Sequence, residues 1–489
     1  MLFNSLDYFL FLGLCLAGFW AARFLGPEAT GDPKAGRSPA AALRLGLIVV
    51  ASCVFYMAWN PRYLGLILFS TALDYVAARQ IHAAKDPTVR KVWLGISLTG
   101  NLGLLGVFKY FNFFAEATAD TFGLFGLSIH PPVLDFLLPV GISFYTFQTI
   151  SYTVDVYRGR LEPVKSPIEF AFYVTFFPQL VAGPIVRAAE FLPQLERPPW
   201  LDRERVGKGL FLIAMGLAKK VIFADFLSVN LVDRVFDDPA AFSATETVIG
   251  LYGFTLQIYA DFSGYTDVAR GSALLFGYEL PENFDRPYQA TNVGEFWRRW
   301  HMTLSSWLRD YLYFPLGGSR HGEPRTYLNL WITLFLIGLW HGASWTFVIY
   351  GNLQALAVVG TRAWGTAREK LGWTRPDPAW VNVIKVVLTM QFVVFSRILF
   401  RSTDLDNAGE IVERLMSGTT SVAQVSDDVW RVLVLGFVLH YVPRSQLEWA
   451  RARFVQLPAW GQGVMLAAVA AIIAIFATHE VVPYIYFQF

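Results

Sequence analysis

The hydrophobic residues of this chain are grouped in long runs that short polar segments separate. The runs lie at about residues 7–25, 43–58, 62–78, 92–114, 134–156, 208–235, 246–262, 327–349, 351–364, 380–400, 428–443 and 463–478. Many are close to the roughly 20 residues that an α-helix needs to cross a bilayer. The pattern predicts an all-α polytopic membrane protein with about a dozen transmembrane helices, folded as one integral-membrane domain over residues 1–489.

One apolar stretch does not fit a simple membrane-crossing helix. Residues 170–192 begin as an apolar run but contain Pro178, Gly183 and Pro184. Non-helical backbone within a membrane is tolerated only where protein or a water-filled cavity surrounds it. A re-entrant segment is therefore expected here.

A second unusual stretch, residues 288–320, combines an aromatic face with charged positions. Trp297, Trp300 and Trp307 fit one face of a helix, and the arginines near them fall on other faces. This pattern predicts an in-plane amphipathic helix whose tryptophan face lies along the cytoplasmic interface.

The charges of the linkers predict the orientation of the chain. Basic residues concentrate at 34–44, 79–91, 158–165 and 203–208, whereas 116–120 and 237–246 are acidic or neutral. Basic linkers stay in the cytoplasm, which places the N-terminus outside. Arg444, Arg451 and Arg453 precede the last run and send the C-terminus outside as well.

The composition agrees with a membrane protein and excludes other classes. Hydrophobic residues make up 54% of the 489 residues and charged residues only 16%, against about 25% charged residues in soluble domains. The net charge of +2 is too small to indicate nucleic-acid binding, so the lipid bilayer is the expected partner. Cys15 and Cys53 lie in apolar segments without metal-binding spacing, so no disulfide framework and no metal site are expected.

A histidine inside an apolar run is the main candidate for chemistry. His341 lies within residues 327–356, and an ionisable side chain at that depth marks a functional site by default. A neutral imidazole can act as a general base toward an incoming hydroxyl. The alternative is a structural histidine that bonds between helices. Gly338 and Gly342 favour the site, because small residues let a substrate or another helix approach the ring.

Further polar residues have weaker claims to a role. His301 is either a second site residue at the cytoplasmic mouth, binding the donor or shaping its path, or a solvated interfacial histidine. Asp261 and Asp267, near the end of an apolar run, are interpreted as a buried pair with Arg270 or Arg286.

Four ordered segments resemble a known family. They are FFPQLVAGPIVR at 176–187, YADFSGYTDVARGSALLFG at 259–277, WRRWHMTLSSWLRDYLYFPLGGSR at 297–320 and WHGASWTFVIYG at 340–351. They look like the membrane-bound O-acyltransferase superfamily. Within it they are similar to the bacterial branch of the alginate O-acetyltransferase membrane subunit and the D-alanine transferase of teichoic acid synthesis. The resemblance runs from about residue 40 to residue 489.

This resemblance implies a fold, two site residues and a reaction. The fold is a ring of helices around a funnel that narrows to a tunnel. His341 falls on the family's catalytic histidine and His301 on its second motif histidine. An acyl group, which we expect to be acetyl, moves from a cytoplasmic thioester, acetyl-CoA or an acylated carrier, to a hydroxyl outside the membrane. The acceptor is an envelope glycan or a periplasmic SGNH-type acetyltransferase, and the location is a bacterial inner membrane. A thioester is already activated, so no bound cofactor is expected.

The aromatic tail, residues 484–489, has two interpretations. The final run with the tail, residues 463–489, looks like a small single-span partner of D-alanylation systems fused to this chain. Tyr486 would then enter the tunnel from outside, take the acyl group and pass it on. A phenol ester suits a relay because phenoxide, with a pKa near ~10, leaves more readily than an alkoxide. The alternative is an aromatic anchor at the outer membrane interface.

Two other functions remain open from the sequence. A transporter or flippase could use an intramembrane histidine as a proton relay, although no internal repeat is evident. An acyltransferase acting on a lipid would take its acceptor laterally from the bilayer.

Overall fold

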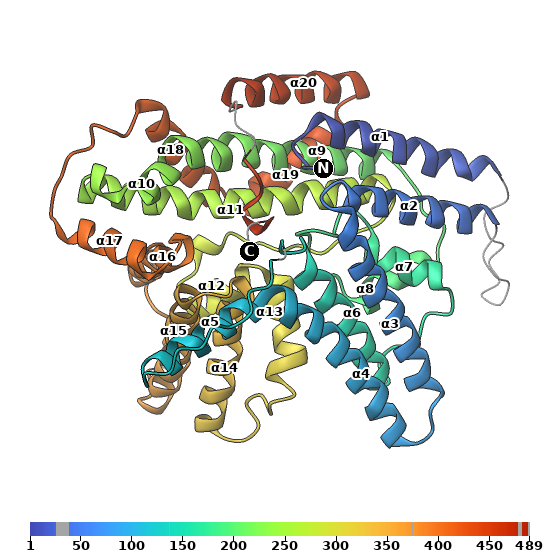
Figure 1. Ribbon diagram of the computed structural model, residues 1–489. Coiled ribbons are helices and arrows are strands. Elements are labelled where there is room, and N and C mark those ends of the chain that lie inside the picture. Colours follow the sequence, from blue (N-terminus) through green and yellow to red (C-terminus); the bar gives the residue numbers. More distant parts are fainter. Residues whose placement is uncertain (26–38, 136, 374, 478–481, 488–489) are drawn as a thin grey trace. The chain divides into compact units, whose positions relative to one another are not determined.

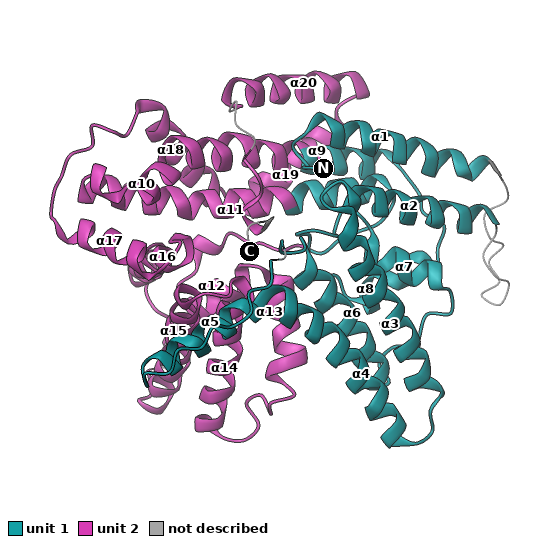
Figure 2. Cartoon of the chain, viewed as in Figure 1, with its two compact units in different colours: residues 1–213, 266–281 teal, residues 214–265, 282–489 magenta. Residues whose placement is uncertain are grey.

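The computed structural model describes residues 1–25, 39–135, 137–373, 375–477 and 482–487. Every regular element in these ranges is a helix, which confirms the all-α prediction (Figure 1). The chain divides into two compact units, residues 1–213 with 266–281 and residues 214–265 with 282–489 (Figure 2). The single-domain organisation stays a prediction.

Unit 1 contains the N-terminal helices. They are α1 (Leu6–Ala21), α2 (Pro39–Met57), α3 (Leu64–Ala83), α4 (Pro87–Leu105), α5 (Phe111–Gly123), α6 (Ile142–Tyr157), α7 (Pro167–Thr175) and α8 (Ala188–Leu195), with parts of α9 (Arg203–Ala218) and α11 (Ala244–Leu275). Between α7 and α8 the backbone is non-helical and almost entirely buried. Gln148 and Gln179 both donate to the carbonyl of Tyr173, in the last turn of α7. The break expected within residues 170–192 is thus confirmed.

Unit 2 contains the remaining helices and all the candidate site residues. Its helices are α10 (Asp233–Asp237), most of α11, α12 (Val293–Arg299), α13 (Met302–Leu308), α14 (Glu323–His341), α15 (Trp345–Lys370), α16 (Ala379–Arg401), α17 (Leu405–Met416), α18 (Asp427–Tyr441), α19 (Arg444–Gln456) and α20 (Ala459–Phe476). It also contains the π-helices η4 (Lys219–Asp225), η5 (Ser228–Val232) and η8 (Arg309–Tyr313), and the 3-10 helices η6 (Pro239–Ala241), η7 (Pro287–Gln289) and η9 (Ile485–Phe487).

Six helices of the described residues are long and apolar enough to cross a membrane. They are Leu6–Phe24, Pro39–Met57, Pro61–Ala83, Pro87–Gly123, Ala379–Arg401 and Ala459–Phe476. The other apolar runs fall on elements that do not combine this length, hydropathy and low charge. The chain is therefore a multi-pass membrane protein, as the sequence predicted.

The helices α14 and α15 pack against each other at two glycines. A Cβ added to Gly338 would lie 2.7 Å from the carbonyl oxygen of Phe347 and from the nitrogen of Gly351. Only glycine permits this approach, so the small residues near His341 bring a neighbouring helix close. The helix is interrupted at residues 342–344, within the apolar run that was expected to continue to residue 349.

The expected in-plane helix within residues 288–320 is interrupted. The helix α12 ends at Arg299, and His301, with φ of 43°, begins α13. A left-handed residue cannot continue an α-helix, and histidine adopts this conformation more often than most residues. Trp297, Trp300 and Trp307 are buried in unit 2 and do not form an exposed interfacial face. The expectation of a continuous helix was therefore wrong, and the position of this segment along the cytoplasmic interface stays a prediction.

Candidate active site

His341 is the last residue of α14, and its ring is held in one tautomer. The side chain is buried, and Nδ1 lies 2.7 Å from the carbonyl oxygen of Ile337, one helical turn earlier. A carbonyl oxygen only accepts hydrogen bonds, so Nδ1 carries the proton. The lone pair therefore resides on Nε2, which is the nitrogen that a general base needs.

The hydroxyl of Tyr486 lies at this nitrogen. Its oxygen is 3.5 Å from Nε2 of His341, although 145 residues separate the two in the chain. The ring is buried and contacts Phe262 at a centroid distance of 4.1 Å. Tyr484 is buried too. Neither tyrosine has the exposed ring of an interfacial anchor; residues 488–489 lie outside the described residues.

His301 is oriented by an asparagine. The Oδ1 atom of Asn283 accepts from the backbone N–H of Thr303 and from its hydroxyl, and lies 3.1 Å from Nδ1 of His301. The N–H of Thr303 fixes the orientation of the amide, so Nδ1 of His301 is the donor. The backbone of Asn283 accepts from Met302 as well, which secures the bend between α12 and α13. His301 is therefore a buried and oriented ring, not a solvated one.

The three candidate residues meet around one tryptophan. The ring of Tyr486 lies 6.1 Å from the ring of His341 and 6.3 Å from that of His301. Trp340 contacts both histidines, at 5.0 and 5.6 Å. The structure thus brings together residues from α14, from the bend before α13 and from η9.

Burial fixes the protonation of two of these groups. It raises the pKa of the Tyr486 hydroxyl far above its ordinary value, while the charge of Arg397 acts in the opposite sense. Burial, and secondarily the nearby His341, lowers the pKa of His301 well below its ordinary value. Tyr486 is therefore a protonated phenol that needs a base, and His301 is a neutral imidazole at physiological pH.

Arg397 places a buried positive charge beside the site. Its guanidinium lies over Trp300 and Phe400, at 4.9 and 5.2 Å, and Phe400 packs against His341. Its Nη1 is 3.4 Å from the hydroxyl of Tyr350. Among the described residues no carboxylate forms an ion pair with it, so its field is available to stabilise negative charge on an oxygen of the reaction.

Asp261 has a different partner from the one expected. It pairs with Lys220 at 2.8 Å, and neither Arg270 nor Arg286 forms an ion pair with it. Lys220 also pairs with Asp225 at 2.6 Å. For Asp261 the expected partners were wrong, because the π-helix η4 places Lys220 beside it. The pairing expected for Asp267 stays a prediction.

Lys220, Asn283 and Arg397 were not predicted from the sequence. Lys220 and Arg397 carried a usable signal, since each is an ionisable residue inside an apolar run, as His341 is. Asn283 carried none, because its role depends on the bend at His301. In the described part of the chain, no three His, Cys, Asp or Glu side chains are grouped so that they could hold a metal ion.

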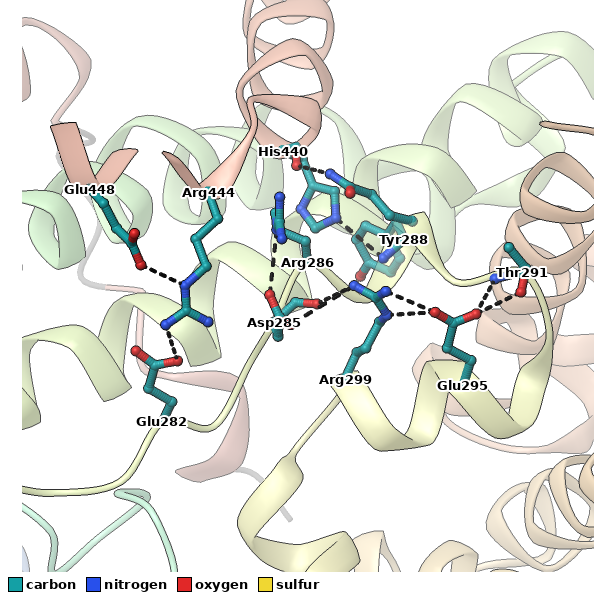
Figure 3. A network of polar contacts seen from close by, with 11 residues as sticks. Glu282, Asp285, Arg286, Tyr288, Thr291, Glu295, Arg299, His440, Arg444 and Glu448 are labelled. Atoms are coloured by element: carbon teal, nitrogen blue, oxygen red, sulfur yellow. Dashed lines mark hydrogen bonds and ion pairs between the residues drawn. The ribbon is translucent and has the colours of Figure 1, made fainter. Parts of the chain in front are cut away.

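A polar network supports the bend from the side of α18 and α19 (Figure 3). Arg299 binds Glu295 at 2.8 Å and the carbonyl oxygen of Asp285 at 3.3 Å. In the same network Nε2 of His440 accepts from the N–H of Tyr288, which makes His440 a structural histidine. The network fixes the loop that carries Asn283.

Comparisons with known proteins identify the family. Residues 164–400, which include His301 and His341, match the family described as MBOAT, membrane-bound O-acyltransferase family. A peptidoglycan O-acetyltransferase of Helicobacter pylori is 36% identical over 395 residues, covering 76% of this chain and 73% of that protein. A probable alginate O-acetylase AlgI of Pseudomonas aeruginosa is 38% identical over 386 residues, covering 78% and 71%.

A more distant relative acts on another polymer. A teichoic acid D-alanyltransferase of Bacillus subtilis is 28% identical over 287 residues, covering 55% of this chain and 70% of that protein. The buried histidines and the family match agree on acyl transfer to a hydroxyl. This chain belongs to the membrane-bound O-acyltransferase family and is an O-acyltransferase.

Proposed function

We propose that this protein acetylates an extracytoplasmic glycan through a covalent ester on Tyr486. The relatives named for peptidoglycan and alginate support an acetyl group and a glycan acceptor. Family membership favours this reaction over the transporter that the sequence left open. A glycan acceptor is likewise favoured over a lipid.

The observation that carries the proposal is the contact of the Tyr486 hydroxyl with Nε2 of His341. Nε2 removes the phenol proton as the oxygen attacks the thioester carbonyl. The C–S bond breaks, and the thiolate leaves with the proton from the imidazolium. The products are acyl-Tyr486 and a free thiol. A distance of 3.5 Å is long for this transfer, but such contacts often tighten when substrate binds.

The second half-reaction returns Tyr486 to its starting state. A hydroxyl of the glycan, or of a periplasmic SGNH-type acetyltransferase, attacks the phenol ester. The acyl group moves to that oxygen, Nε2 of His341 takes the proton of the hydroxyl, and the departing phenoxide recovers this proton. Phenoxide leaves readily, and the charge of Arg397 helps to stabilise it.

The donor and the setting follow from the same proposal. The donor is a cytoplasmic thioester, acetyl-CoA or an acylated carrier protein, and no bound cofactor takes part. The protein lies in a bacterial inner membrane with both termini outside, so that Tyr486 approaches from the side of the acceptor. His301 orients the donor beside Trp340.

Replacing Tyr486 with phenylalanine tests the proposal. Tyr486→Phe keeps the buried ring and deletes only the oxygen, so we expect a stable protein with acyl transfer reduced at least a hundredfold. Mass spectrometry of the wild type should find an acyl group on Tyr486. The control Tyr441→Phe, which removes the hydroxyl of a half-exposed tyrosine in the same unit, should stay active. Full activity in Tyr486→Phe would rule out the ester on this residue.

A further inference from the structure

The segment that carries Tyr486 lies on a buried group of charges. The side chain of Lys220 is fully buried, and its ammonium is 2.6 Å from Asp225 and 2.8 Å from Asp261. Both carboxylates are nearly inaccessible to solvent. Charges at such depth are costly unless ion pairs and hydrogen bonds satisfy them.

The π-helix η4 makes this grouping possible. Residues five apart lie on different faces of an α-helix, because each residue turns by about 100°. A π-helix is hydrogen-bonded between residues five apart and brings Lys220 and Asp225 onto one side. Asp261 completes the group from α11.

Three consecutive residues of the tail contact this group. The N–H of Ile485 donates to Oδ2 of Asp261 at 2.8 Å. The ammonium of Lys220 lies 3.5 Å from the carbonyl oxygen of Pro483 and 4.3 Å from the ring centre of Tyr484. Two of the three contacts involve the backbone of the tail.

From this geometry we infer that Lys220, Asp225 and Asp261 form a docking site for the tail segment 483–485, and that this site positions the Tyr486 hydroxyl at His341. That docking serves acyl transfer rests on the proposed function. That the tail binds to this site does not. These are positioning residues, because they contact the residues before Tyr486 and not the reacting oxygen.

The substitution Asp261→Asn should weaken the docking of the tail without unfolding the protein. Aspartate uses one oxygen for Lys220 and the other for the N–H of Ile485, whereas asparagine has a single oxygen and cannot serve both. Lys220 keeps its pair with Asp225 in this variant, so no buried charge is left alone. Asp233→Asn is the matched control, since Asp233 lies in the same unit and bonds to Arg401 and Ser228, not to the described residues of the tail.

The first experiment measures docking without any chemistry. In a Tyr486→Cys background, a membrane-permeable maleimide should label the cysteine slowly when the docking site is intact. Adding Asp261→Asn should speed labelling about tenfold or more, as expected for loss of a hydrogen bond to a charged acceptor. Adding Asp233→Asn should not. Equal labelling rates with Asp261→Asn would overturn the docking site, whether or not Tyr486 carries an acyl group.

The second experiment asks whether the docking site acts through position. The probe is p-cresol, which is the tyrosine side chain without its backbone. Asp261→Asn should lose acylation of Tyr486 but transfer acyl groups to added p-cresol at least as fast as the wild type. His341→Ala should do neither. A folded Asp261→Asn protein that fails with p-cresol as well would overturn a positioning role.

A third variant changes a side chain of the tail itself. Tyr484→Leu removes the ring over Lys220 and its edge contact with Tyr265, at 5.0 Å, and leaves all three charges unchanged. We expect the same pattern as for Asp261→Asn, namely faster labelling at position 486 and retained transfer to p-cresol. Unchanged labelling in both variants would contradict the inference.

Discussion

The two site histidines are oriented by different partners, and this distinguishes their roles. Nδ1 of His341 donates to a carbonyl of its own helix, which leaves Nε2 facing the Tyr486 hydroxyl. Nδ1 of His301 is bound by Asn283, across a bend in the chain. The first arrangement is that of a base with its lone pair directed at a hydroxyl. The second fixes a neutral ring at the wall of the same site.

Replacing His341, the proposed base, should abolish the reaction. For His341→Ala we expect a folded protein whose acyl transfer is at least ~10²–10⁴-fold slower, as is usual when a general base is removed. Radiolabelled acetyl transfer in purified membranes measures this loss. His321→Ala, at an exposed histidine, should have wild-type activity. More than about a tenth of the activity in His341→Ala would contradict the role of base.

His301 should make stability depend on pH. Burial lowers the pKa of His301 in the folded protein, whereas an unfolded histidine has a pKa near ~6.5. Below that pH the unfolded chain binds a proton that the folded protein does not, so the free energy of unfolding falls by up to about 1.4 kcal/mol per pH unit. Thermal unfolding measured in detergent should show this loss as the pH falls from about 7.5 to about 5. It should be smaller in His301→Gln, and identical slopes would refute the prediction.

The residues that the sequence identified share one property. His341, His301 and Tyr486 stand out as polar or titratable groups in apolar or aromatic surroundings, and they meet in the structure. Partners are harder to predict, since Lys220 reaches Asp261 through a π-helix. A helical pattern of period 3.6 does not reveal such a turn.

At the scale of helices, the position of His341 depends on the crossing of α14 and α15. The two backbones approach closely at Gly338 and Gly351, just before the histidine. The sequence indicated small residues for a close approach but did not say whether substrate or helix would come near. The break at residues 342–344 was missed because the apolar run continues across it.

Adding a methyl group at this crossing should displace the base. In Gly338→Ala the new carbon would collide with backbone atoms of α15, so we expect about 1–3 kcal/mol of destabilisation and reduced activity. Gly360→Ala is the control, because nothing lies within 4 Å of a Cβ there and alanine favours helix. Thermal unfolding and activity of both variants test this. Equal behaviour would show that the crossing tolerates a side chain.

The expected in-plane helix illustrates the limit of periodicity. Trp297, Trp300 and Trp307 recur at helical spacing, yet α12 and α13 are separate helices. The spacing gives no sign of the left-handed backbone at His301. A contact with Asn283 stabilises it, and such tertiary contacts are not encoded locally.

At the scale of the molecule, the apolar runs correctly predicted an all-helical membrane protein. Their number was less informative, since six helices of the described residues meet the criteria for a span. Several runs instead form helices that carry buried charges, such as Lys220 in η4.

The two faces of the membrane should have different substrates. Because a charged CoA thioester cannot cross the bilayer, acetyl-CoA should support transfer in sealed inside-out vesicles. Sealed right-side-out vesicles should be inactive with external acetyl-CoA until detergent opens them. Release of free thiol measures the reaction in both. Equal activity in sealed vesicles of both orientations would contradict a donor site that opens only to the cytoplasmic face.

Tyr486 and His341 belong to the same polypeptide chain, and for the proposed relay this has a kinetic consequence. A hydroxyl that belongs to the same chain as its base is always present at a fixed effective concentration. Without glycan, the enzyme should release a burst of thiol equal to a single equivalent per molecule and then stop. With glycan it should follow ping-pong kinetics, because Tyr486 must pass its acyl group to the glycan before the next donor can react.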